Sequence, residues 1–292
     1  MRGLAVRLLA ALAGVLVLLV AYGVLVEPRL LLDEVHLDAR LDHLDEAWTG
    51  EQVVVFSDLQ VGMWFANLGM IERVVARASE DDPAAVLIAG DLIYGKDPAV
   101  AVQVEQVMDL LDPLFATEVP VYAVLGNHDH ASGGADRLTD ALESRGAHVL
   151  RNESATLAHP DLPDAPGLQL VGVGPARPGL ADVEAALDGV EQGTPRLVMM
   201  HNPTSFPDLP TNSAPLAVAG HTHCGQIAMP GTPHWSYLDL TEEEALVADG
   251  YAADDYGQEG NRLYVNCGIG FSLLPIRFNA PPQLVVIELA PA

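Results

Sequence analysis

Short runs of Val, Ile, Leu and Ala recur along the chain, separated by segments rich in Gly, Pro, Asn and Asp. Apolar runs of this length and composition predict buried β-strands. Stretches with helical spacing lie between them, at Met70–Glu80, Val100–Leu114, Ala135–Arg145 and Leu180–Leu187. The alternation of strands and helices predicts an α/β layered fold. The predicted strands are Val53–Phe56, Ala85–Ala89, Val119–Leu125, Leu168–Val173, Arg196–Met200, Leu216–Ala219, Arg262–Asn266 and Gln283–Leu289.

The longest apolar run lies near the N-terminus, where Leu8–Val26 contains no charged residue. Its length is close to the roughly 20 residues that a helix needs to cross a bilayer. Arg2 and Arg7 precede it and acidic residues dominate the segment after it, so the positive-inside rule predicts a cytoplasmic N-terminus and an extracytoplasmic remainder. A cleaved signal peptide is the alternative, because Ala21-Tyr22-Gly23 loosely resembles a cleavage site. The apolar run continues past that point, which favours an uncleaved, single-pass anchor in the cell membrane.

These patterns divide the chain into three parts. Residues 1–26 are expected to be the cytoplasmic N-terminus and the transmembrane signal anchor. Residues 27–50, which mix Pro28 with many charges, are expected to be a juxtamembrane linker entering the first strand. Residues 51–292 then form one large domain, because α/β layers often exceed the roughly 150 residues of an average domain. Half of the residues are hydrophobic and 18% are charged, so a sizeable core can be buried.

The charge balance argues against nucleic acid as a partner. The chain has 40 acidic and 14 basic residues and a formal net charge of -26. Binding to phosphate backbones needs clusters of basic residues, and the sequence contains none. The acidity is therefore interpreted as a solvated surface.

The two cysteines, Cys224 and Cys267, are placed in an oxidising compartment by the predicted topology. Their even number and that compartment favour a disulfide. The sequence does not show whether their Cα atoms come within bonding range, so a pair of free thiols stays the alternative.

Five predicted strands end directly in residues that can bind metals. In open α/β sheets, ligands bind at the carboxyl ends of the strands, so these motifs are expected to converge. Each motif is weak alone, because an Asp after a strand is more often a helix cap. Their succession is what predicts a site. In chain order they are Ser57-Asp58-Leu59-Gln60, Gly90-Asp91, Gly126-Asn127-His128-Asp129, His201 and Gly220-His221-Thr222-His223.

In this order the motifs resemble those of the calcineurin-like metallophosphoesterase superfamily, and they look most like its membrane-associated bacterial phosphodiesterase branch. The resemblance covers Gln52–Leu289 and includes His201-Asn202-Pro203 and the run from Gly220 to Gln226. It implies a four-layer α/β/β/α sandwich that follows one N-terminal transmembrane helix. It also implies that residues 51–292 are a catalytic domain with two metal ions at one sheet edge.

The resemblance assigns a role to each matching residue. Asp91 would bridge two divalent ions, because a carboxylate has two oxygens. His128 would be the general acid and Asp129 the residue that orients it. The remaining ligands would be Asp58, Gln60 and His223 at the first ion, and Asn127, His201 and His221 at the second.

This ligand set implies a metal-dependent hydrolase. Mixed oxygen and imidazole donors suit Mn best, with Fe, Zn or Mg as alternatives. The two ions would supply hydroxide to cleave a phosphodiester or pyrophosphate bond, and the anchor suits a lipid-linked or cell-envelope ester. Phe206, Tyr237 and the loop Met229–Asp255 are candidates for shaping specificity.

Gln60 departs from the family pattern, which usually has His at this position. An amide oxygen is a harder and weaker donor than imidazole, so the first site is expected to favour Mn or Mg over Zn. Two alternatives remain open. Gln60 could support the ligands without touching metal, or activity could have been lost, leaving a non-catalytic membrane-anchored protein that binds metal or partners.

Overall fold

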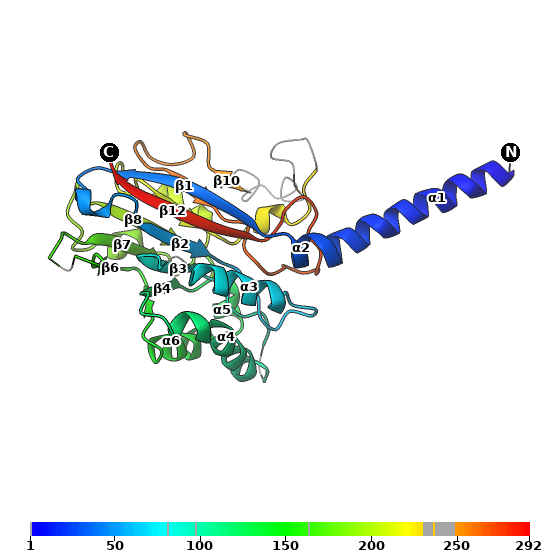
Figure 1. The fold of residues 1–292 in the computed structure, drawn as a ribbon, viewed down its shortest axis with the longest axis horizontal. Coiled ribbons are helices and arrows are strands. Elements are labelled where there is room, and N and C mark those ends of the chain that lie inside the picture. Colours follow the sequence, from blue (N-terminus) through cyan, green and yellow to red (C-terminus); the bar gives the residue numbers. More distant parts are fainter. Residues whose placement is uncertain (1, 81, 97, 163, 230–235, 237–248) are drawn as a thin grey trace.

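Two six-stranded sheets pack face to face, with helices over the outer face of the first sheet (Figure 1). The computed structural model describes residues 2–80, 82–96, 98–162, 164–229, 236 and 249–292. The first sheet, in spatial order, contains β1 (Asp33–Leu41), β12 (Gln283–Pro291), β2 (Gln52–Phe56), β3 (Ala85–Ala89), β4 (Val121–Val124) and β5 (His148–Val149). The second contains β10 (Gly250–Tyr251), β11 (Leu263–Val265), β9 (Ala217–Ala219), β8 (Arg196–Met200), β7 (Leu168–Val173) and β6 (Glu153–Leu157).

The helices divide into an N-terminal group and a group that covers the sheets. The N-terminal group contains α1 (Arg2–Ala21), a π-helical turn (Tyr22–Val26) and α2 (Glu27–Leu30). The others are α3 (Leu68–Ala78), α4 (Val100–Phe115), α5 (Asn127–Ala131), α6 (Ala135–Glu143) and α7 (Val183–Ala186), with 3₁₀ turns at Glu46–Trp48, Pro203–Asp208 and His223–Gly225.

The period-two alternation of strand side chains explains the layers. On β2, Val53 and Val55 point into the core between the two sheets, whereas Val54 and Phe56 face the opposite way, toward α3, α4 and α6. A strand buried on both faces needs apolar residues at every position, which is what the apolar run predicted. The outer face of the second sheet packs against α7 and the 3₁₀ turn at Pro203–Asp208. The predicted α/β sandwich is confirmed.

All eight predicted strands are present, with ends that differ by no more than two residues. The predicted helix at Leu180–Leu187 is shorter, because Asp182 caps its start and accepts a hydrogen bond from the Ala185 N–H at 2.9 Å. Four strands were not predicted, namely β1, β5, β6 and β10. They are short or mix polar with apolar residues, so they lack the continuous apolar run of the central strands.

The expectation that residues 27–50 form a linker is wrong for most of that segment. Residues 33–41 form β1, which pairs in parallel with β12 along its whole length. Leu37, Ala39 and Leu41 alternate along it and are buried in the core between the sheets. Intervening charged residues face solvent. This alternation is typical of a half-buried strand, and the prediction missed it because it relied on continuous apolar runs.

Strand direction places the ligand-bearing edge of the first sheet next to the N-terminal helix. β1 follows α2 directly and runs parallel to β12. β12 is antiparallel to β2, while β3 and β4 are parallel to β2. The carboxyl ends of β2, β3 and β4 therefore lie at the edge where β1 begins. From the same end of the molecule α1 projects away from the domain (Figure 1).

The N-terminal helix has the length and composition of a membrane span. The apolar helical segment covers Gly3–Leu30 with a mean hydropathy of 2.7 in its most apolar window, of which 6% is buried. The side chains of Leu12, Leu16 and Leu18 are largely exposed. One apolar N-terminal helix is therefore confirmed as a candidate anchor.

Replacing Leu41 by Ala should test whether β1 belongs to the domain core. Leu41 is fully buried, so the Leu41→Ala variant should lose about 2–4 kcal/mol of stability through lost packing and a cavity. Thermal unfolding of the full chain in detergent micelles, followed by circular dichroism, measures this. The exposed neighbour Arg40 provides the control, and Arg40→Ala should melt within a few degrees of wild type. Equal melting temperatures for both variants would mean that β1 contributes nothing to the fold.

Candidate functional site

The backbone at the predicted ligands is unusual. Five of the seven have positive φ angles, although none is glycine. Such conformations cost on the order of 1 kcal/mol each and concentrate at functional sites. In an extended strand, successive side chains point to opposite faces. The turns here instead direct these side chains toward one space. The five residues are Asp58 (φ 56°), Gln60 (φ 51°), Asp91 (φ 56°), His221 (φ 76°) and His223 (φ 52°).

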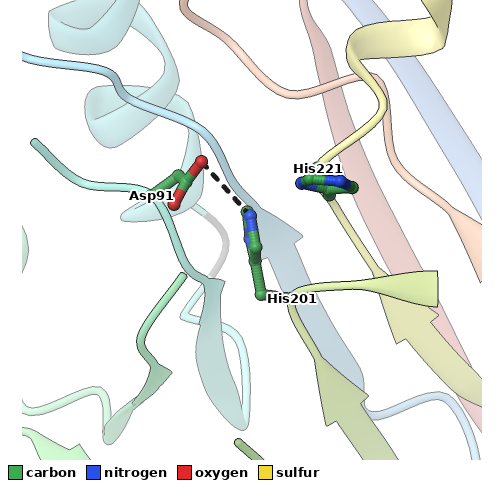
Figure 2. Close-up of side chains that lie close together, drawn as sticks. All are labelled: Asp91, His201 and His221. Atoms are coloured by element: carbon green, nitrogen blue, oxygen red, sulfur yellow. Dashed lines mark ion pairs between the residues drawn. The ribbon is translucent and has the colours of Figure 1, made fainter. Parts of the chain in front are cut away.

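Asp91, His201 and His221 form the centre of the site, with one potential ligand atom of each within 4.8 Å of the others. Figure 2 shows the three side chains converging from the ends of β3, β8 and β9. The Nε2 atom of His201 lies 3.2 Å from Asp91 Oδ2 and 3.1 Å from Asn127 Oδ1. The rings of His201 and His221 are 5.1 Å apart. This half of the site could hold a metal ion.

Asp58, Gln60 and His223 form a second group that contacts Asp91 through Gln60. His223 Nε2 is 3.4 Å from Asp58 Oδ1, and Gln60 Nε2 donates to Asp91 Oδ2 at 2.8 Å. The backbone N–H of His221 donates to the Asp58 carboxylate at 3.1 Å. The structure thus brings all seven predicted ligands together, and Asp91 contacts members of both groups.

Gln60 Oε1 indicates that the site fits a cation. This oxygen is buried and has no hydrogen-bond partner among the described residues. A buried polar atom without a partner costs about 1–3 kcal/mol, and a metal ion would satisfy it. The same side chain contacts the Asp91 carboxylate, which itself lies beside His201, and carboxylate oxygens and imidazole nitrogens are donors that divalent metals take in proteins.

Hydrogen bonds behind the site fix its imidazoles. His201 Nδ1 lies 2.8 Å from the Ala89 carbonyl oxygen, which favours a proton on Nδ1 and leaves Nε2 to face Asp91 and Asn127. Arg277 approaches His223 from behind, with a guanidinium nitrogen 3.3 Å from Nδ1. These contacts fix the orientation of the His201 and His223 rings.

Burial and charge strongly perturb the protonation of these groups. Burial alone would lower the pKa of His201, but the Asp91 carboxylate raises it to about 10. Burial would raise the pKa of Asp91, yet His201 holds it well below its usual range. For His223, burial lowers the pKa to about 4, against the opposing effect of Asp58. His201 and Asp91 thus form a charge pair in which a cation can replace the imidazole proton.

Asp129 has a different place from the one predicted. Its two carboxylate oxygens accept backbone N–H groups from Asp91, Leu92, Ile93 and Gly126, at 2.9–3.0 Å. Among the described residues, the Asp129 carboxylate has no hydrogen bond to the imidazole of His128, which it was expected to orient. Asp129 therefore ties the loop after β3 to the loop after β4. Burial and the Asp91 charge raise the pKa of Asp129, while the backbone N–H groups favour its charged form.

His128 lies at the edge of the ligand cluster. Its backbone N–H donates to Asp91 Oδ1 at 2.8 Å. Its half-buried imidazole packs against the ring of Tyr94, with centroids 4.7 Å apart. This position is compatible with the predicted role of His128 as a general acid, which stays a prediction.

Sequence reasoning assigned no role to Arg277, which is fully buried. Its guanidinium donates to the carbonyl oxygens of Cys267, Gly270 and Ala280 and contacts His223. A lone Arg in an apolar and glycine-rich stretch was the available signal, because a buried charge needs several partners.

The two cysteines form a disulfide. Cys224 and Cys267 are joined, with Cα atoms 4.7 Å apart. The bond connects the turn that carries His223 to the loop after β11. It therefore constrains a predicted ligand from the second sheet.

The predicted specificity determinants have mixed outcomes. Phe206 is buried and stacks on Tyr256, with ring centroids 6.1 Å apart, so it belongs to the core of the second sheet. Tyr237 and most of the loop Met229–Asp255 lie outside the described residues.

Comparison with known proteins agrees with this geometry. Residues 52–225, more than half of the chain, match the family of calcineurin-like phosphoesterases. Phosphodiesterase YaeI of Escherichia coli is 29% identical, with 82% of each chain covered. A transmembrane protein with a metallophosphoesterase domain from Danio rerio is 25% identical over 88% of this chain and 57% of its own length. UDP-2,3-diacylglucosamine pyrophosphatase LpxG of Chlamydia trachomatis is 23% identical over 82% of this chain and 83% of its own length.

Substitution of Gln60 should show whether its amide oxygen ligates metal. The Gln60→Ala variant should bind Mn²⁺ about 10-fold more weakly, equivalent to ~1.4 kcal/mol. The Gln60→His variant should bind Zn²⁺ more tightly by about the same factor, because imidazole is the softer donor. Calorimetric titration of the full chain in micelles measures both. Gln103→Ala is the control, because this buried glutamine donates to the Tyr94 carbonyl oxygen instead. Unchanged affinities in both Gln60 variants would exclude ligation.

The Asp129→Asn variant should separate a structural role from the orienting role. An amide nitrogen would face backbone donors, so two hydrogen bonds are lost and stability should fall by about 2–4 kcal/mol. The melting temperature of the full chain measures the loss, with the exposed Asp109→Asn variant as control. A variant that melts like wild type but hydrolyses esters slowly would restore the orienting role.

Proposed function

Because the chain belongs to the calcineurin-like phosphoesterase family and is a phosphoester hydrolase, we propose that it cleaves a phosphodiester or pyrophosphate bond with a dinuclear metal centre. The observation that carries this proposal is the position of Asp91. Its Oδ2 atom lies 3.2 Å from His201 Nε2 and 2.8 Å from Gln60 Nε2, so that it contacts one member of each predicted ligand group. A single carboxylate between two sets of donors suits a pair of cations.

The residues that would hold the cations follow from this division. Asp58, Gln60 and His223 would bind one ion, Asn127, His201 and His221 the other, and Asp91 both. Mn²⁺ is the ion that we assign first, since amide and carboxylate oxygens are hard donors. When bound, a pair of divalent cations would lower the pKa of a water molecule and neutralise charge on phosphate oxygens.

The protein's own groups complete the reaction. In the proposal, His128 donates a proton to the leaving oxygen, a role that a positioned imidazole can take. Asp129 keeps the loops after β3 and β4 at a fixed separation, so that Asp91 and Asn127 keep their places. Rigid positioning of this kind lowers the barrier because the donors need no rearrangement during the reaction.

The substrate class that we propose is an ester carried by a lipid or by another envelope component. The apolar helix leaves the domain at the ligand-bearing edge, so the site opens near the bilayer when that helix spans it. The relative from Chlamydia trachomatis is named as a pyrophosphatase of a diacylated sugar nucleotide, which supports a lipid-linked ester. We place the N-terminus in the cytoplasm and the domain outside, because Arg2 and Arg7 precede the apolar run.

Hydrolysis of bis-(p-nitrophenyl) phosphate by the full chain in micelles tests the proposed centre. With Mn²⁺ present, the Asp91→Ala variant should be slower than wild type by about 100-fold or more. The His128→Ala variant should lose about 10²–10⁴-fold in kcat. The Asp109→Ala variant is the matched control, because it removes an exposed carboxylate of α4.

Two outcomes would contradict the proposal. If the wild type hydrolysed the ester no faster than the Asp91→Ala variant, the proposed hydrolase activity would be rejected. Two bound metals without hydrolysis of any ester in a panel of soluble and lipid-linked phosphodiesters would favour the non-catalytic binding protein. A clear preference for soluble esters in that panel would keep the hydrolase and reject the lipid-linked substrate.

A further inference from the structure

We infer that the domain carries an apolar rim beside the metal site, and that this rim inserts into the lipid surface around the anchor. The rim consists of Trp64 and Phe65, in the loop after β2, and Leu273 and Leu274, in the loop between β11 and β12. Its partner is the boundary of headgroups and acyl chains in the leaflet that faces the domain. The inference rests on the anchoring by α1 proposed above.

The C-terminal loop is fixed to the end of the anchor. The Gly23 carbonyl oxygen accepts the backbone N–H of Arg277 at 2.8 Å. The Glu27 carboxylate accepts the backbone N–H groups of Asn279 and Ala280, at 2.9 and 2.7 Å. A side chain at Gly23 would clash, because its Cβ would lie 2.9 Å from the Arg277 carbonyl oxygen. The loop between β11 and β12 therefore stays where the membrane helix places it.

The loop after β2 is fixed to the same point through Arg29, in α2. This guanidinium donates to the carbonyl oxygens of Phe65 and Ala66 at 2.7 and 2.8 Å, and it lies 4.3 Å from the centre of the Phe65 ring. The indole N–H of Trp64 donates to the Leu273 carbonyl oxygen at 3.4 Å. The two loops thus form one surface at the base of the anchor. Figure 1 shows this place, where α2 joins the long N-terminal helix to the domain.

The rim residues are large, apolar and exposed. Trp64 is 63% exposed and Leu273 67%, and Phe65 and Leu274 are also more than half exposed. Clusters of this kind on a folded domain mark interaction surfaces. Phe65 and Leu273 have φ angles of 59° and 64°, a region that bulky residues rarely occupy. The loops thus present these side chains outward at a conformational cost.

Continuity with the anchor identifies the lipid surface as the occupant. Leu19 and Leu25, near the end of the apolar helix, are 45% and 53% exposed. Leu19 lines one hollow with Phe278 of the C-terminal loop, so exposed apolar side chains extend from the helix to the loop that carries the rim. Tryptophan is enriched at the depth of lipid headgroups, and arginine side chains at that depth can extend to them. A second copy of the chain fits less well, because two chains of net charge -26 repel each other.

The same loops contact the metal ligands. The backbone N–H of Gly270 donates to the Asp58 carbonyl oxygen at 2.7 Å. Gln226, three residues after His223, holds the tip of the loop, because it accepts the Ser272 N–H at 2.6 Å and donates to the Leu274 carbonyl oxygen at 2.8 Å. Insertion of the rim would therefore press the mouth of the site against the bilayer, and an ester could enter it from the lipid phase.

Spin labels on the full chain in lipid nanodiscs test the inference. The two native cysteines are joined in a disulfide, so a nitroxide reacts at one engineered cysteine. The Leu273→Cys label should be more accessible to oxygen than to a water-soluble nickel chelate, with an oxygen-to-nickel ratio at least about 5-fold above that of Val102→Cys, because a label buried at the boundary of headgroups and acyl chains lies in an apolar medium. Val102 is the matched control, because it is 65% exposed on α4.

Each alternative gives a different result. Equal ratios at the two positions would place Leu273 in water and overturn the inference. Low accessibility to both reagents would mean that protein covers the rim, as in a dimer, and would also overturn it. The same oxygen-to-nickel ratio, measured with a Leu12→Cys label in α1, tests whether the N-terminal helix lies in the bilayer. Hydrolysis of a soluble ester by the labelled Leu273→Cys protein shows separately that the phosphoesterase is intact, so failure of the rim and failure of the enzyme are distinguishable.

Discussion

The crowding of electron-rich side chains round Asp91 is the constraint on which the rest of the structure depends. Carboxylate, amide and imidazole acceptors lie within 3.1–3.4 Å of one another in a buried space, an arrangement that is unfavourable without positive charge. The fold holds them there in several ways. Turns with positive φ point the ligands inward, four backbone amides fix Asp129, and the disulfide ties the His223 turn to a neighbouring loop. His201 supplies positive charge beside Asp91 in the protein alone, and a metal cation could replace its proton there.

The central strands and the residues that converge after them could be predicted because each rests on a local signal. A run such as Val53–Phe56 is apolar at every position, and the residues directly after it are polar. β1 could not be recognised in this way, since its pairing with β12 joins the two ends of the chain. Asp129 was misplaced for a related reason. Its identity indicates an acceptor, but whether it accepts from an imidazole or from backbone amides depends on how two loops meet in space.

Arg277 shows how distant segments combine at the site. Its backbone N–H binds the end of the anchor, while its guanidinium binds three carbonyl oxygens and contacts His223. Burial lowers the pKa of Arg277 to about 10, although Asp58 and Glu27 oppose the change. The guanidinium thus stays charged at neutral pH, and it is surrounded by acceptors. The N-terminal helix, the C-terminal loop and His223 are consequently parts of one hydrogen-bonded unit.

Gln60 has an amide N–H group and an amide oxygen, and the two atoms have different surroundings. In the protein alone its amide N–H group binds Asp91, while its oxygen has no partner among the described residues. A histidine here would offer a softer nitrogen as donor to a metal. The amide offers an N–H group for Asp91 and a separate oxygen that can accept a cation. Gln60 therefore holds the Asp91 carboxylate through its N–H group, and we expect a lower affinity for soft metals if its oxygen is a ligand.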